Sequence, residues 1–92
     1  LYISALLDVY GDFLNEKAKT LTEYYYNEDL SLAEIAENEG ITRQGVSDFV
    51  KRSEAQLFEF EEKLGICKIS AELKRAAANN DANKIFDLID KL

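Results

Sequence analysis

The chain of 92 residues contains no proline and only four glycines. Proline and glycine are the residues that most often interrupt a helix, so almost nothing in this sequence breaks helical structure. Apolar residues recur with three-four spacing along most of the chain, which is the pattern of amphipathic helices. We therefore expect an all-α fold, whose helix boundaries are set by capping residues and by the glycines.

The first expected helix begins near the start of the chain. It ends or bends near Gly11, because glycine destabilises a helix by about 1 kcal/mol relative to alanine. Its apolar stripe is expected to consist of Ile3, Leu6, Leu7, Tyr10, Phe13 and Leu14.

A second helix is expected over residues 16–26, capped by Asn15. Its inward-facing residues are predicted to be Ala18, Leu21 and Tyr25. Tyr24 and Tyr26 would then lie nearer the surface. They are expected either at the edge of the core or in an interface with a partner, a setting in which tyrosine is enriched.

The segment from Ser31 to Arg52 predicts two helices joined by a tight turn. Ser31 and Glu34 match the S-x-x-E capping box, in which each side chain satisfies a free backbone amide of the other residue. Gly40 is expected to end this helix in the left-handed conformation, and Thr42 to cap the next helix. A helix-turn-helix also needs a small residue and an apolar wedge between its helices. These positions are Ala36 and Ile35, Ile41, Val46 and either Phe49 or Val50.

The fourth helix is expected to be the longest, from Arg43 to Leu64, and to end at Gly65. Ser70 is predicted to cap a fifth helix and Asp81 a sixth. We expect one compact domain over residues 1–92, in which a helix-turn-helix core at about 15–64 is followed by a helical extension at 66–92. The chain lacks methionine, so the numbering is expected to begin after a missing start.

If the fourth helix entered a major groove, the outward residues of its first turns would contact DNA. Arginine can pair with guanine and glutamine with adenine, whereas lysine and arginine also hold phosphates. The candidate nucleic-acid-binding residues are Arg43, Gln44, Ser47, Lys51 and Arg52. The alternative is that they form only the solvated side of a long helix.

The charge of the chain opposes binding to a polyanion, because the net charge is −7 and each phosphate contact needs a cation. Asp48 lies one turn before Arg52 and is expected to pair with it. The preceding helix and its lead-in carry the acidic set Glu28, Asp29, Glu34, Glu37 and Glu39. This composition favours basic protein partners.

Catalysis has little support, since the chain has no histidine, metal cluster, phosphate-binding glycine loop or activated serine. We expect a protein without enzymatic activity, metal or cofactor. The stretch "EFEEK" (residues 59–63) is interpreted as a solvated face. Cys67 is expected to be a buried or half-buried filler, and a single cysteine fits a reducing cytoplasm. No apolar run predicts a membrane span.

The pieces "LLDVYG", "LNEKAKTLTEYYYNEDLSLAEIAE", "ITRQGVSDFVKRSE" and "FEEKLG" resemble the YlxM-like family of bacterial helix-turn-helix proteins, over Leu6 to Ile66. The centre is more distantly similar to the fourth region of bacterial sigma factors, whose second motif helix reads promoter DNA. The sigma-like resemblance covers the five candidate residues of the fourth helix. Asp48 and the acidic preceding helix depart from it.

The resemblance implies a small cytoplasmic bacterial protein. Genes of this family commonly neighbour that of the signal-recognition-particle GTPase, which implies a role in co-translational targeting. We therefore expect a regulatory or adaptor protein that contacts that GTPase or its RNA. The alternatives are a transcriptional regulator that reads DNA and a structural dimerisation module. Excess apolar surface on the first and last helices also predicts a homodimer.

Overall fold

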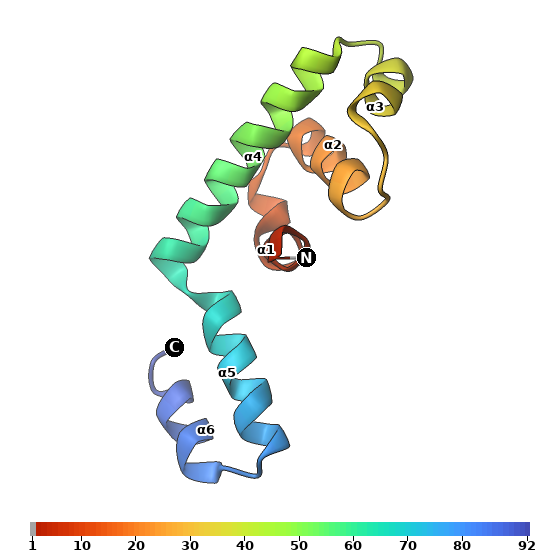
Figure 1. Ribbon diagram of the computed structural model, residues 1–92. Helices are drawn as coiled ribbons and strands as arrows, with labels where there is room; N and C mark the ends of the chain where they lie inside the picture. The colour runs from red at the N-terminus through yellow and green to blue at the C-terminus, as the bar shows by residue number, and fades with distance from the viewer. Residues whose placement is uncertain (1) are drawn as a thin grey trace.

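The computed structural model describes residues 2–92 and confirms the all-α prediction for them. Its elements are α1 (Tyr2–Tyr10), the 3₁₀ turn η1 (Gly11–Phe13), α2 (Glu16–Tyr26), α3 (Leu32–Glu39), α4 (Arg43–Leu64), α5 (Ile66–Ala78) and α6 (Ala82–Ile89). The long helix α4 is the axis of the molecule: α1, α2 and α3 pack beside it, and α5 and α6 form a hairpin beyond its end (Figure 1). None of the helices described could cross a membrane, because none is long and apolar enough.

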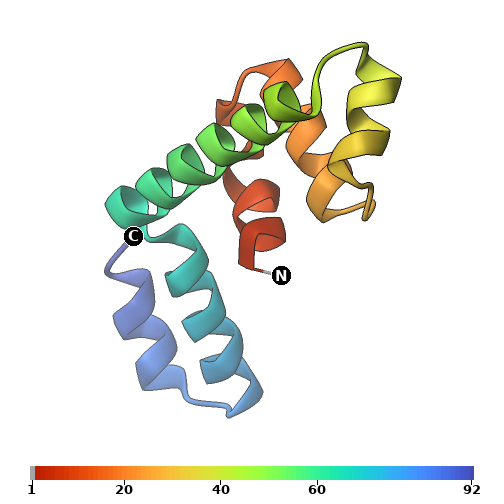
Figure 2. The same cartoon turned by 45° about the horizontal axis from the view of Figure 1, so that its top comes forward.

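The molecule is elongated, with principal extents of 52 × 23 × 15 Å, so the expectation of a compact unit was wrong. The reason is that α5 leaves α4 at an angle and packs mainly against α6, away from α2 and α3 (Figure 2). The assignment of the whole chain to one domain remains a prediction.

Side-chain caps define most helix starts, as expected. Asn15 Oδ1 accepts a hydrogen bond of 2.8 Å from the amide of Ala18, which begins α2. Asp81 Oδ1 accepts one of 3.0 Å from the amide of Lys84 and begins α6. Each cap satisfies a backbone amide that has no partner inside its own helix.

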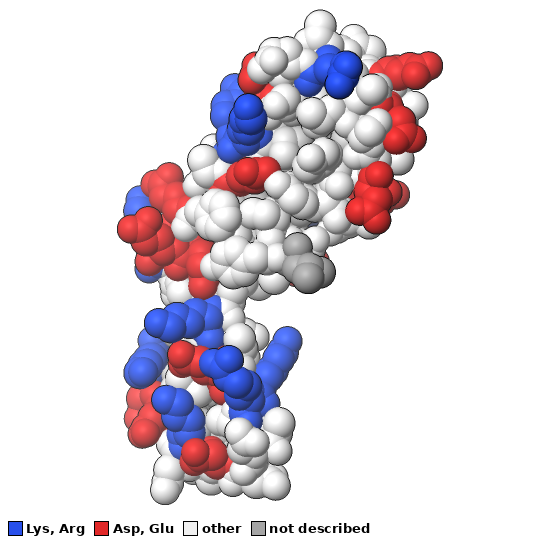
Figure 3. Space-filling view, in the orientation of Figure 1, with Lys and Arg blue, Asp and Glu red and all other residues white. Residues whose placement is uncertain are grey.

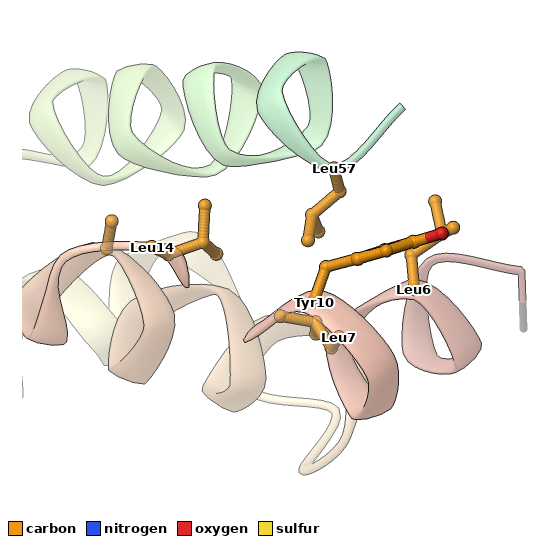
Figure 4. Packing of buried hydrophobic residues seen from close by; sticks show 6 residues of the cluster. Leu6, Leu7, Tyr10, Leu14 and Leu57 are labelled. Carbon is orange, nitrogen blue, oxygen red and sulfur yellow. The ribbon is translucent and has the colours of Figure 1, made fainter. Parts of the chain in front are cut away.

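Two clusters of buried residues form the core. The first joins α1 and the start of α2 to the second half of α4, and Figure 4 shows Leu57 of α4 pointing toward the side chains of α1. Its members are Leu6, Leu7, Tyr10, Leu14, Ala18 and Leu57. The second joins α2 and α3 to the first half of α4 and consists of Leu21, Ile35, Ala36, Val46 and Val50. Burying one large aliphatic side chain contributes about 1.5–3 kcal/mol, so the second cluster fixes α3 relative to α4.

Of the three consecutive tyrosines of α2, Tyr24 and Tyr26 lie at the edge of the core, as predicted, but the prediction that Tyr25 faces inward was wrong. Tyr25 is 36% exposed, whereas Tyr24 and Tyr26 are half-buried against the second cluster. The hydroxyl of Tyr26 donates to the carboxylate of Glu54 on α4, which holds this ring toward the core. Helical spacing alone gives no information about a contact between two helices. It therefore predicted that Tyr25, and not Tyr26, faces the core.

The start of α5 also differs from the prediction, because Ser70 lies inside α5 and caps nothing. Gly65 has φ 65°, ends α4, and is followed at once by α5. The first amides of α5 bind side chains from other helices: Ile66 N donates to Tyr10 Oη (3.0 Å). Cys67 N (3.0 Å) and Lys68 N (3.1 Å) donate to the two carboxylate oxygens of Glu61.

Glu61 therefore caps a helix, although "EFEEK" was interpreted as a solvated face. Its Oε1 also accepts a hydrogen bond of 2.6 Å from the hydroxyl of Tyr10, so α1, α4 and α5 meet at one carboxylate. Burial would raise the pKa of Glu61, but these hydrogen bonds outweigh it and hold the pKa below its usual range. We call Tyr10, Glu61 and the first turn of α5 the α5 cap.

Candidate nucleic-acid interface

The turn between α3 and α4 has the geometry of a helix-turn-helix. The amides of Gly40 and Ile41 both donate to the carbonyl of Ala36, and Gly40 has φ 67°. Most residues avoid that left-handed conformation, which glycine adopts without steric cost. Thr42 Oγ1 then accepts a hydrogen bond of 2.9 Å from Gly45 N and begins α4. Residues 40–42 thus turn the chain directly from one helix into the next.

The start of α3 contains both hydrogen bonds of the capping box. Ser31 Oγ accepts from Glu34 N (3.1 Å), and Glu34 Oε1 accepts from Ser31 N (3.0 Å). The bond from the backbone of Ser31 holds the pKa of Glu34 below its usual range. Between the two motif helices Ile35, Ala36, Val46 and Val50 are buried, while Ile41 and Phe49 are half-buried.

Four of the five candidate residues of α4 are exposed, and the five line two separate hollows along the first half of the helix. Arg43, Gln44, Lys51 and Arg52 are exposed, and Ser47 is half-buried. Arg43, Gln44 and Ser47 line a shallow hollow with Leu32 of α3. Lys51 and Arg52 line a second hollow with Asp48. A helix presenting such a row at its start can place several side chains against base edges and phosphates.

The predicted ion pair between Asp48 and Arg52 is wrong. The Asp48 carboxylate instead accepts a hydrogen bond of 2.9 Å from Gln44 Nε2. Arg52 donates from Nε to the backbone carbonyl of Asp48 at 3.4 Å, and its guanidinium carbon lies 5.0 Å from the centre of the Phe49 ring. The attraction of the cation to the ring favours this position. The charge of Arg52 is therefore not neutralised by Asp48.

The acidic residues of the motif lie on the α3 side of this surface. Glu34, Glu37 and Glu39 are all exposed. Figure 3 shows acidic side chains along the edge formed by α3, while basic side chains lie over the first half of α4 with acidic ones among them. Asp48 is exposed on α4 beside Lys51 and Arg52, so positive and negative charge are only partly separated between the two helices.

Sequence reasoning missed Lys17 as part of this region. Lys17 Nζ lies 5.7 Å from the centre of the Phe49 ring, which also contacts Arg52. The spacing of Phe49 and Arg52 on α4 could have indicated their contact. No sequence signal places Lys17 beside them, because it belongs to α2.

Cys67 is half-buried and packs against the first cluster, as predicted. Burial and the neighbouring Glu61 carboxylate raise the pKa of its thiol. A reactive cysteine needs the opposite, a lowered pKa. The packing of Cys67 and the raised pKa of its thiol both fit a residue that fills space at the edge of the first cluster.

The fold and this surface define an all-α helix-turn-helix protein with an exposed second motif helix. A family model matches residues 1–91, and the chain belongs to that family, UPF0122, described as "Putative helix-turn-helix protein, YlxM / p13 like". The resemblance to YlxM-like proteins is thereby confirmed.

Relatives from several bacteria share most of the chain, and each is named UPF0122 protein. The one from Clostridium kluyveri is 43% identical over 90 residues, covering 98% of this chain and 77% of its own. The one from Symbiobacterium thermophilum is 49% identical over 88 residues, covering 96% and 80%. The one from Shouchella clausii is 39% identical over 103 residues, covering 100% and 94%.

Proposed function

We propose that this chain is a non-enzymatic regulatory protein that binds duplex DNA through the exposed first half of α4. The observation that supports the proposal is the set of exposed polar residues Arg43, Gln44, Lys51 and Arg52 in the first half of α4, directly after a helix-turn-helix turn. An α-helix fits the major groove of B-form DNA, which is about 12 Å wide, whereas the major groove of A-form RNA is too narrow. The sequence predicted that Asp48 would neutralise Arg52, which would weaken phosphate binding. Asp48 instead binds Gln44, so this argument against DNA binding does not hold.

Selection from random duplexes, followed by fluorescence anisotropy, tests this proposal. Arg43→Ala and Gln44→Ala are each expected to weaken the selected duplex by about 1–3 kcal/mol, the cost of losing a bidentate base contact. Lys63→Ala is the matched control, because Lys63 is exposed on the same helix but pairs with Glu59 at 2.9 Å. Selection that enriches no sequence, or equal losses for Arg43→Ala and Lys63→Ala, would contradict the proposal.

A second candidate function is an adaptor of the signal recognition particle pathway in the cytoplasm. The exposed carboxylates of α3 favour it, since they fit a basic protein partner. Pull-down with the particle GTPase, with and without its RNA, tests this function. The triple change of Glu34, Glu37 and Glu39 to Gln should weaken protein binding, while Arg43→Ala should weaken RNA binding. Absence of saturable binding in both arms at moderate salt would count against this function.

We also propose that the chain forms a homodimer through the α5–α6 hairpin. Exposed apolar residues of this region include Ile66, Phe86, Ile89 and Leu92. Sedimentation at tens of micromolar is expected to show a dimer, and Phe86→Glu should shift it toward monomer. Phe13→Glu is the matched control, since both rings are 66% exposed and Phe13 lies away from the hairpin. A wild-type monomer, or equal effects of both changes, would contradict the dimer.

A further inference from the structure

Two cations lie on one aromatic ring where α2 meets α4. Lys17 Nζ is 5.7 Å and Arg52 Cζ is 5.0 Å from the centre of the Phe49 ring. Within residues 2–92 neither cation forms an ion pair, whereas Lys19 binds Asp12 at 2.6 Å. Two positive charges on one ring repel each other. The chain has more acidic than basic residues, yet no carboxylate is paired with Lys17 or Arg52 in residues 2–92. The arrangement leaves positive charge available to an external anion.

A hollow of about 100 Å³ is lined by Arg52 and by the Phe49 ring, over which Lys17 lies without lining the hollow itself. Its lining residues are Asn15, Ala18, Phe49, Arg52, Ser53 and Gln56, and none of them is acidic. Asn15 uses its Oδ1 atom to cap α2, which leaves its Nδ2 group as a donor. Gln56 is exposed and offers a second amide donor. Cations and amide donors around one hollow are the groups that recognise phosphate oxygens.

The hollow lies on one flank of α4, and the acidic helix α3 lies on the other. Helical residues are about 100° apart, so Phe49 and Ser47 point to nearly opposite sides of α4. Ser47 faces the hollow shared with α3, and Phe49 faces the hollow shared with α2. A helix in the major groove is bordered by a phosphate backbone on each side. With α4 in the groove, the exposed carboxylates of α3 would repel the DNA backbone on their side of the helix. Arg52 and Lys17, on the α2 side, would attract the DNA backbone on the other.

We infer that the hollow between α2 and α4 binds one backbone phosphate of the duplex that α4 reads. Arg52 supplies charge from the wall of the hollow, and Asn15 and Gln56 supply the amide donors. Lys17, over the Phe49 ring, would supply a second positive charge from its edge. The inference rests on the proposed function, because it needs α4 in the groove. The inference also means that the protein binds the groove asymmetrically. The phosphate contacts lie on the α2 side of α4, and the α3 side, with its carboxylates, lies farther from the DNA.

The test compares Lys17→Gln with Lys19→Gln, two changes on the same helix that remove the same charge. Lys19 already pairs with Asp12, so it is the matched control. Binding to a fluorescein-labelled mixed-sequence duplex, and to the selected duplex, is measured by anisotropy over a series of salt concentrations. Lys17→Gln should reduce the slope of log K against log salt by about 0.9 on both duplexes. Lys19→Gln should leave the slope unchanged.

The possible outcomes separate the two proposals. A wild-type protein that binds neither duplex, even at low salt, refutes the proposed function and this inference with it. A wild-type protein that binds, with the same slope for Lys17→Gln and Lys19→Gln, refutes only the phosphate site. Lys17→Arg keeps the charge and should retain the wild-type slope, and a reduced slope for this variant would also overturn the inference.

Discussion

Replacing Glu61 by alanine should destabilise the protein by about 3 kcal/mol, because one carboxylate serves three donors. Losing the acceptor for the amides of Cys67 and Lys68 costs about 1 kcal/mol for each, the typical value of a helix cap. The Tyr10 hydroxyl is buried and loses its acceptor, which adds about 1 kcal/mol at the lower end of such penalties.

Thermal unfolding followed by circular dichroism measures this loss. For a domain of this size 1 kcal/mol shifts Tm by about 4–8 °C, so Glu61→Ala should lower Tm by roughly 12–24 °C. The matched control is Glu62→Ala, because Glu62 is the next residue on α4 and is exposed. A surface change of this kind alters stability by less than about 0.5 kcal/mol. Equal Tm values for the two variants would refute the α5 cap.

Four further results are expected. The lowered pKa of Glu61 stabilises the folded state at pH values above the ordinary carboxyl pKa of about 4.3. As pH falls this stabilisation is lost, so acid titration should lower the free energy of unfolding more in the wild type than in Glu61→Ala. Burial and the hydrogen bond to Glu61 raise the pKa of Tyr10 to about 12. Its contribution to the free energy of unfolding is therefore complete below a pH of about 10 and is lost as pH rises above that, which absorbance titration of the wild type and of Tyr10→Phe can check. Gly40→Ala, at φ 67°, should cost about 1–2 kcal/mol in urea unfolding. Ser31→Ala should cost about 0.5–2 kcal/mol by the same measurement.

Local signals in the sequence predicted most of the fold. Asn15, Ser31, Thr42 and Asp81 each cap the helix that follows them, and each cap involves residues only three positions apart. The left-handed conformation of Gly40 likewise depends on its own backbone. Such short-range features can be read from a single sequence because both partners lie in one window.

Contacts outside the capping and periodicity rules account for the wrong predictions. Ser70 was expected to cap α5, but Glu61 binds the amides of Cys67 and Lys68 from six and seven positions away, and Tyr10 binds the amide of Ile66 from 56 positions away. The predicted Asp48–Arg52 pair failed because Gln44 and Phe49 offer nearer partners on the same helix. The exposed face of α4 was predicted, but Lys17 was not, since its place beside Phe49 depends on how α2 crosses α4. The distinctive part of the candidate site is therefore the part that tertiary packing creates.

The α5 cap joins the C-terminal hairpin to two different helices. The first turn of α5 takes one hydrogen-bond acceptor from Tyr10 of α1 and two from Glu61 of α4. An uncapped helix of 13 residues is marginal by itself in water. Residues 66–92 therefore depend on contacts with both α1 and α4 for part of their stability.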